Sequence, residues 1–354
     1  MSKTDIELTD REIATIMPHY PVGPVVFTRP CGGTANAGVA VITRQGQFFL
    51  KRRNPRYCRP EAIIYDHHVV KSLARAGLPC PRVIRTIPGS RWLEHEGHIY
   101  EMFEFVDGDV VETPTEPQLV AAGEMLARLH QATETLHPPG AKAFGRFWDP
   151  ARALGLLRPF VDRVTDGRLG SLSAVTPETA QAQLQALVSE VERVGRALPD
   201  SAYAALPHAV IHGDWHPANI KFSGGTVSGI FDFDWFDRQP RMVDVADGLL
   251  FFCGVRPHVE GTGDIWSLTR TPELQLDRMR AFMTGYGSRI RPAAGELQAL
   301  PELMAVRWVY ARVDAAERKI DEPDQIRFIL RDVLSPLEWI AEHRGRLAEA
   351  GWWE

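Results

Sequence analysis

The chain has 354 residues, of which 44% are hydrophobic and 24% are charged, as in ordinary globular proteins, which excludes a disordered scaffold or a coiled coil. A formal net charge of −5 argues against a protein that coats nucleic acid or binds an anionic membrane surface. Lysine is scarce, so a lysine at a demanding position is informative: the six are Lys3, Lys51, Lys71, Lys142, Lys221 and Lys319.

The four cysteines form no C-x-x-C pair, which predicts free thiols and a reducing, cytoplasmic location. The first twenty residues are polar and acidic and do not predict a signal peptide. No stretch approaches about 18 uncharged apolar residues, so no transmembrane helix is expected. The sequence predicts neither nucleic acid nor a membrane as a partner, and it predicts no oligomeric state.

The first hundred residues are predicted to be rich in β-strands. Residues 22–50 indicate two or three strands separated by glycine turns, with apolar residues alternating up to Leu50. A helix is expected at 61–77, ending at Gly77 with prolines just beyond. Strands are expected again at 81–87 and 98–106.

After Asp107-Gly108 the apolar residues repeat mainly with helical spacing. The predicted helical segments are 118–133, 177–198, 274–290, 302–320 and 324–349. A short β-rich insert, 209–234, interrupts them. We therefore predict an α+β protein with a small β-rich N-terminal lobe, residues 1–105, and a large, mostly helical C-terminal lobe, residues 106–354.

The insert carries the most informative polar residues. An apolar strand leads into His212-Gly213-Asp214, Asn219 follows five residues later, and Asp232 follows a predicted hairpin. Such an aspartate could simply cap a turn. Phosphoryl transfer, however, needs a base near the acceptor hydroxyl and oxygen ligands for Mg²⁺, and this spacing supplies both on neighbouring loops.

HGDWHPANIKF followed by GIFDFD resembles the HGD-x-H-x-x-N and I-D-F motifs of the aminoglycoside phosphotransferase family. This kinase-like superfamily includes homoserine, choline and methylthioribose kinases, and the likeness covers about residues 25–330. It implies a bilobal protein-kinase-like fold with ATP and Mg²⁺ as cofactors. It also implies that Asp214 is the catalytic base and that Asn219 and Asp232 are Mg²⁺ ligands.

The resemblance extends to the N-terminal lobe. Lys51 ends an apolar strand at the family's lysine position, where it would hold the α- and β-phosphates. The acid that would orient Lys51 falls on Asp66, although aspartate is one methylene shorter than the family's glutamate. Glu61 is the alternative.

Further nucleotide contacts are expected on a turn and on a hinge. Gly33 and Thr34 lie where the family has its phosphate-covering loop, although a plain hairpin turn would also explain these glycines. The segment YEMFEFVDG resembles the family's hinge, which implies backbone contacts from Glu104 and Val106 to adenine.

The remaining polar residues near the motif have supporting roles in this prediction. His212 would fix the catalytic loop, and Asp244 matches a family aspartate that helps to hold it. Asp234 is an additional carboxylate that could touch metal or substrate. His212 and His216 lack a third ligand at a usual zinc spacing.

Four aromatic residues could line an acceptor pocket or belong to the core: Trp235, Phe236, Trp308 and Tyr310.

Together these residues predict an ATP- and Mg²⁺-dependent kinase that phosphorylates a hydroxyl group of a small molecule. The acceptor is left open among an amino alcohol such as homoserine, a sugar and an aminoglycoside, with homoserine-kinase-like members the nearest in appearance. The short segment between Asp232 and the next helical stretch leaves little room for an activation loop, which disfavours a protein Ser/Thr kinase. A non-catalytic nucleotide-binding regulator is the other alternative.

Overall fold

The computed structural model describes residues 8–31, 36–168, 170, 175–256, 266 and 269–354. Gly33 and Thr34, predicted to cover the phosphates, therefore lie outside the described residues.

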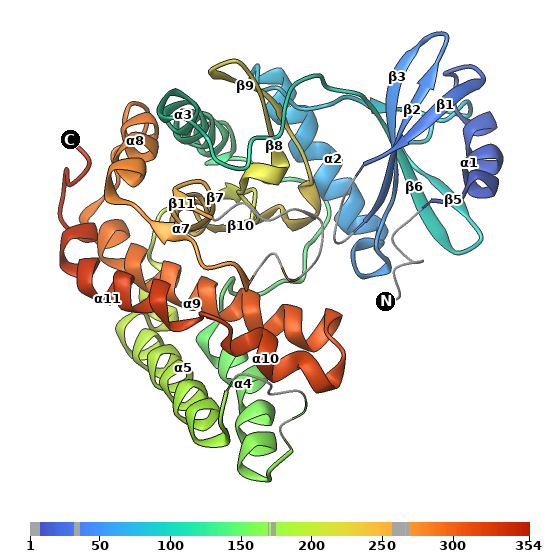
Figure 1. Ribbon diagram of the computed structural model, residues 1–354. Coiled ribbons are helices and arrows are strands. Elements are labelled where there is room, and N and C mark those ends of the chain that lie inside the picture. Colours follow the sequence, from blue (N-terminus) through green and yellow to red (C-terminus); the bar gives the residue numbers. More distant parts are fainter. Residues whose placement is uncertain (1–7, 32–35, 169, 171–174, 257–265, 267–268) are drawn as a thin grey trace.

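The N-terminal part is built on an antiparallel sheet of six strands, seen at one side of the molecule in Figure 1. The strands run in the order β1-β2-β3-β6-β4, and β5 also pairs with β6. Their bounds are β1 Val25–Pro30, β2 Ala37–Thr43, β3 Gly46–Arg52, β4 Val83–Ile84, β5 Leu93–His95 and β6 His98–Glu104. The strand expected at 81–87 is thus only two residues long.

β3 lies between β2 and β6 and has two chemically different faces. Leu50 is fully buried in an apolar cluster with Ile13 and Ile16 of helix α1 (Asp10–Ile16). Because strand side chains alternate between faces, Lys51 and the following Arg53 project from the opposite side. Helix α1 seals the first face, so the second is left for charged groups.

Helix α2 (Pro60–Arg75) lies between this sheet and the centre of the molecule (Figure 1). Pro60 occupies its first turn, where a missing N–H costs nothing. The helix ends just before Gly77, whose φ of +77° is the left-handed conformation expected of a terminating glycine. The predicted helix at 61–77 is therefore confirmed.

Two small antiparallel pairs form the predicted β-rich insert. β7 (His208–Ile211) pairs with β10 (Asp237–Pro240), and β8 (Ile220–Ser223) pairs with β9 (Thr226–Ile230). Figure 1 places β8 and β9 beside α2, so the loops that carry the motif residues approach the N-terminal sheet.

The rest of the chain is largely helical. The longer helices are α3 Glu116–Thr133, α4 Pro150–Thr165, α5 Pro177–Ala197, α7 Met242–Phe251, α8 Leu276–Gly287, α9 Ala294–Lys319 and α11 Leu334–Leu347. The short elements are η2 Met17–His19, η3 Pro55–Tyr57, α6 Asp200–Ala204, η4 Pro217–Asn219, η5 Phe233–Trp235, β11 Gly254–Val255, β12 Glu273–Leu274, η7 Glu322–Asp324 and α10 Gln325–Leu330. Within the described ranges, no helix is long and apolar enough to cross a membrane.

Helices α3 and α8 approach each other closely because each presents a glycine to the backbone of the other. A Cβ on Gly123 would lie 2.0 Å from the Phe282 carbonyl oxygen, and one on Gly285 would lie 2.0 Å from that of Val120. Helix α9 packs against α4, α5, α7, α10 and α11. The α+β architecture, with a β-rich N-terminal part and a helical C-terminal part, is as predicted, whereas α1 and α4 were not anticipated.

Candidate active site

The loop that carries Asp214 is anchored by a buried aspartate of α7. Asp244 accepts hydrogen bonds from the backbone N–H groups of His212 and Gly213, both at 2.7 Å. His130 Nε2 lies 3.1 Å from the same carboxylate. Gly213 has a φ of +78°, and a Cβ there would lie 2.6 Å from the Trp235 carbonyl oxygen, so this turn requires glycine.

His212 connects this loop to the segment that precedes Asp232. Its Nε2 lies 2.8 Å from the carbonyl oxygen of Phe231, and its ring is buried. The two motifs are therefore joined by the His212 ring and a backbone carbonyl rather than by the side chains of Asp214 and Asp232, which leaves those two carboxylates available for ligands.

Asp214 lies among three polar side chains. Its Oδ1 is 3.3 Å from an Nη of Arg307, and its Oδ2 is 3.2 Å from His216 Nε2. Asn219 Nδ2 donates to the Asp214 carbonyl oxygen at 2.9 Å. Burial alone would raise the pKa of Asp214, but His216 and then Arg307 outweigh it and hold the pKa below its ordinary value. The carboxylate is thus ionised at neutral pH and can accept a proton.

Asn219 and Asp232 retain oxygen atoms that could bind a cation. The Phe231 N–H donates to the Asn219 carbonyl at 2.9 Å, which brings the two segments together. Among the described residues, neither Asn219 Oδ1 nor Asp232 Oδ2 has a hydrogen-bond partner. Carboxylate and amide oxygens are the ligands that Mg²⁺ prefers, so this pair fits such an ion.

Asp232 has two further properties of a functional residue. Its φ of +58° is left-handed, which is uncommon outside glycine and is found at strained functional positions. Burial raises its pKa, Lys51 opposes this rise, and Asp234 adds to it. Bound cations would relieve this unfavourable negative charge.

Lys51 projects from β3 toward these two aspartates. Its Nζ lies 2.8 Å from Asp234 Oδ1 and 3.4 Å from Asp232 Oδ1. Asp234 is 1% exposed, and its other oxygen accepts from Asn36 at 2.8 Å. Both oxygens of Asp234 are therefore already used, and this residue anchors Lys51 in the structure.

Asp66 does not form the predicted pair with Lys51. It lies 2.6 Å from an Nη of Arg53 and 2.6 Å from Lys142 Nζ. Arg53 follows Lys51 by two residues, so both face α2, and the longer guanidinium spans the gap that the short aspartate leaves. The alternative, Glu61, is an exposed residue in the first turn of α2 and is not paired with Lys51 either.

Arg53 is the centre of this buried charge cluster, and its importance was not predicted. Besides Asp66, it lies 2.7 Å from Glu101 of β6 and 2.7 Å from Asp234. Glu101 in turn lies 2.6 Å from His67 Nε2. Arg53 therefore ties β3, α2 and β6 to the loop after β9, across the two parts of the chain.

The expected phosphate-covering turn can be followed only at its end. Asn36 is the first described residue after this turn, and its Oδ1 accepts from the Asn54 N–H at 2.9 Å. Since Asn36 also donates to Asp234, the end of the turn is attached directly to the acidic cluster.

Each of the two expected hinge residues already has one backbone group in a hydrogen bond. The Glu104 N–H donates to the Arg82 carbonyl at 2.9 Å. The Val106 carbonyl accepts from Lys221 Nζ at 2.6 Å, and this ammonium group lies 4.3 Å from the Phe105 ring centroid. A lysine next to the hinge was not expected, and it occupies one of the groups predicted for adenine.

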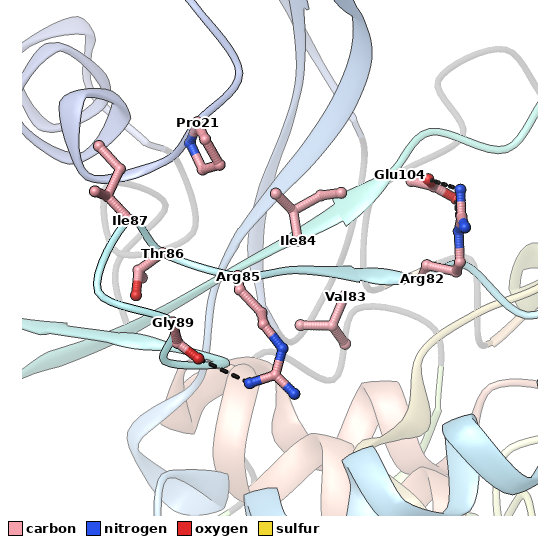
Figure 2. A pocket seen from close by; sticks show the side chains of 9 residues that line it. All are labelled: Pro21, Arg82, Val83, Ile84, Arg85, Thr86, Ile87, Gly89 and Glu104. Carbon is pink, nitrogen blue, oxygen red and sulfur yellow. Dashed lines mark hydrogen bonds and ion pairs between the residues drawn. The ribbon is translucent and has the colours of Figure 1, made fainter.

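A separate open pocket lies on the N-terminal sheet (Figure 2). Glu104 is the single candidate site residue among those that line it, and the Glu104 side chain faces Arg82 there. Asp214, Asp232 and Lys51 do not line this pocket, so it is separate from the candidate active site. Its lining residues are Pro21, Arg82, Val83, Ile84, Arg85, Thr86, Ile87, Gly89 and Glu104.

The four aromatic candidates divide into two groups. Phe236 and Trp308 are core residues, at 0% and 2% exposure, and the Trp308 indole donates to the Val333 carbonyl. Trp235 and Tyr310 instead form ring contacts with Trp148, at centroid distances of 6.4 and 5.3 Å, on the side of Asp214 where Arg307 lies.

Two of the site residues missed by sequence reasoning carry a usable signal. Lys142 is one of only six lysines, and it reaches both Asp66 and the Asp234 carbonyl. Arg53 follows Lys51 with the period of a strand. Arg307 lies inside a regular helix, where nothing in the sequence separates it from a surface arginine.

Comparison with known proteins agrees with this geometry. Residues 26–282 match the phosphotransferase enzyme family, and the chain belongs to this family. A homoserine kinase of Chelativorans sp. (strain BNC1) is 25% identical over 348 residues, which cover 96% of this chain and 94% of that protein. The predicted family membership and the predicted phosphotransferase class of enzyme are both confirmed.

Solved structures show the same fold. A microcompartment-associated aminopropanol kinase has a TM-score of 0.70 and 19% identity, over 96% of this chain and 100% of that one. An amicoumacin kinase in complex with AMP-PNP, Ca²⁺ and its ligand has a TM-score of 0.64 and 13% identity, over 95% of this chain and 93% of that one.

Proposed function

We propose that this protein is an ATP- and Mg²⁺-dependent kinase that transfers the γ-phosphoryl group to a hydroxyl of a small molecule. The observation that carries the proposal is the convergence of Asp214, Asn219, Asp232 and Lys51 from both parts of the chain. Nucleotide and metal would bind between residues 1–105 and residues 106–354. The solved amicoumacin kinase, which holds a nucleotide analogue and a divalent cation, supports this choice of ligands.

Each residue has a distinct role in this proposal. Asn219 and Asp232 would hold the metal through their unpartnered oxygens, and Mg²⁺ would neutralise charge on the phosphates. Lys51 would exchange part of its contact with Asp234 for the α- and β-phosphates. Asp214 would accept the proton of the acceptor hydroxyl as the phosphoryl group transfers in line.

A small acceptor is favoured over a protein substrate by the segment that follows Asp232. It forms the short helix η5, then β10 (Asp237–Pro240) in register with β7, and then α7 from Met242 onward. Every part of this segment is therefore used in the fold, and none is left as a loop that could bind a polypeptide.

Substitution of the proposed base tests the assignment. Asp214→Asn should lower kcat by about 100- to 10,000-fold while leaving the KM for ATP within about threefold, because it removes proton transfer and not nucleotide binding. ADP release in the presence of an accepted substrate measures both constants.

The matched control is Asp277→Asn, which changes a carboxylate that is 91% exposed and paired with Arg280 on α8. It should keep parental kinetics. An Asp214→Asn enzyme with more than a tenth of the parental kcat would show that Asp214 is not the base.

A further inference from the structure

A group of aromatic side chains forms a wall near the catalytic base. We define the wall as Tyr57, Phe144, Trp148, Trp235 and Tyr310, whose rings follow one another at centroid distances between 5.2 and 6.4 Å. These residues come from η3, the segment before α4, η5 and α9. Such a surface suits a small organic acceptor, since the large, rigid rings lose little entropy when they bind one.

Arg307 joins this wall to Asp214. Its guanidinium lies 4.0 Å from the Trp148 ring centroid, and one of its nitrogens lies 3.3 Å from Asp214 Oδ1. Its Nε is held at 2.5 Å by Asp247. Arg307 therefore links the base directly to one end of the aromatic wall.

The rim of the wall carries positive charge. The Arg56 guanidinium lies 5.9 Å from the Trp235 ring centroid, and that of Arg152 lies 5.6 Å from the Tyr310 ring centroid. Both arginines are exposed, and neither has a carboxylate partner among the described residues. Arg318, the next cation along the rim, is already paired with Asp314.

The Tyr310 phenol is influenced by these arginines. Burial raises the pKa of the Tyr310 phenol, and Asp314 adds to this effect, whereas Arg152, Arg56 and Arg318 all act in the opposite direction. Three guanidinium groups from different elements are therefore close enough to influence one hydroxyl.

We propose that the acceptor of this kinase carries a carboxylate, which Arg152 and Arg56 bind at the rim while the acceptor's hydroxyl faces Asp214. This inference rests on the proposed function. A guanidinium fork matches a planar carboxylate in shape and charge, and the same cations repel a polycationic drug. The relatives differ on this point, since homoserine contains a carboxylate and aminopropanol does not.

Two pairs of acceptors that differ only in the carboxylate test the proposal. L-homoserine is compared with 3-amino-1-propanol, and L-threonine with 1-amino-2-propanol, by ADP release and by mass spectrometry of the phosphorylated product. The carboxylate-bearing member of an accepted pair should have a kcat/KM at least about tenfold higher, the value of one charge-assisted hydrogen bond. Equal values, or a preference for the amino alcohol, would overturn the inference and leave the proposed function standing.

Variants identify the groups responsible. Arg152→Gln and Arg56→Gln should each raise the KM for the carboxylate-bearing acceptor by about tenfold, with kcat and the KM for ATP unchanged, and lysine should restore part of the loss. The control is Arg158→Gln, an exposed arginine on the same helix as Arg152. If the arginine variants change the KM for ATP, or lower both members of a pair equally, these side chains do not bind the acceptor's carboxylate.

Calorimetric titration separates this inference from the proposed function. Homoserine and 3-amino-1-propanol are titrated into the protein with AMP-PNP and Mg²⁺ present. If only the carboxylate-bearing compound binds, and Arg152→Gln abolishes this binding, the inference is supported. If that compound binds but is not phosphorylated, the proposed kinase function is refuted while the carboxylate site stands. Binding of neither compound, or of both alike, would refute the carboxylate site.

Discussion

The buried arginine at the centre of the charge cluster provides the sharpest test of how the two parts of the chain are joined. Arg53 is 3% exposed and lies within 2.7 Å of the carboxylates of Asp66, Glu101 and Asp234. Arg53→Met keeps the approximate length and the apolar stem but removes the charge. Because it leaves three carboxylates buried with too few cations, we expect it to destabilise the protein by about 3–5 kcal/mol.

The lowered pKa of Glu101 points in the same direction. Burial alone would raise this pKa, but Arg53, followed by His67, lowers it from 4.5 to about 2. At about 1.4 kcal/mol per pKa unit, this shift corresponds to about 3 kcal/mol. Since the folded-state pKa is lowered, the stabilisation is fully present above pH 4.5 and is lost as the pH falls toward 2. The deficit of Arg53→Met should therefore be largest at pH 7 and smaller near pH 3.

Thermal unfolding followed by circular dichroism at pH 7 and pH 3 measures this deficit. For a chain of this size, we expect the midpoint at pH 7 to fall on the order of 5–10 °C. Arg82→Met is the matched control, since Arg82 is also ion-paired but its side chain is 77% exposed, and it should lower the midpoint much less than Arg53→Met does. Equal losses in the two variants, or the same Arg53→Met deficit at both pH values, would refute the reasoning.

Three further substitutions test the loop anchor, the helix packing and a buried acid. Asp244→Asn should reduce kcat and should lower the free energy of unfolding by about 2–3 kcal/mol. The reason is that each Asp244 oxygen accepts one backbone N–H, whereas an amide has only one oxygen that can accept. Unchanged kinetics and unchanged urea unfolding would contradict this. Gly123→Ala should lower the free energy of unfolding in urea by at least about 2 kcal/mol, because the new Cβ would lie 2.0 Å from a carbonyl oxygen. Its control, Gly155→Ala on the open side of α4, should stabilise the protein by up to about 1 kcal/mol. Similar effects of the two substitutions would count against the packing argument. Burial raises the pKa of Asp247 to about 7, so the folded protein keeps a proton that the unfolded chain releases near pH 3.8. Asp247 should therefore lower the stability progressively as the pH rises from about 4 to 7, and Asp247→Asn should remove this part of the pH dependence; parallel stability curves of the two proteins would show that the Asp247 pKa is not raised.

The sequence predicted the elements whose residues form a local pattern. The hairpin around Leu50, the helix that ends at Gly77 and the β-rich insert all follow from periodicity and turn residues. Asp214, Asn219 and Asp232 could be proposed from the sequence because the roles predicted for them require fixed spacing along one loop and one hairpin.

The partners of these residues depend on distant parts of the chain and could not be predicted. Nothing in a sequence says that Asp66 lies nearer to Arg53 than to Lys51, because this depends on how α2 packs against β3. Arg307 follows the catalytic loop by more than ninety residues. Contacts of this kind are set by tertiary packing, which short-range sequence patterns do not predict.

The distribution of lysine makes this protein a favourable target for chemical footprinting. Most of its described lysines lie around the proposed nucleotide and acceptor sites, and burial lowers the pKa of three of them, Lys142, Lys221 and Lys319. A lowered pKa leaves more of each amine neutral and nucleophilic near neutral pH. Lys221 and Lys319 are the more accessible of the three, so acylation of these two amines, followed by mass spectrometry of the labelled peptides, would report ligand occupancy without an engineered reporter.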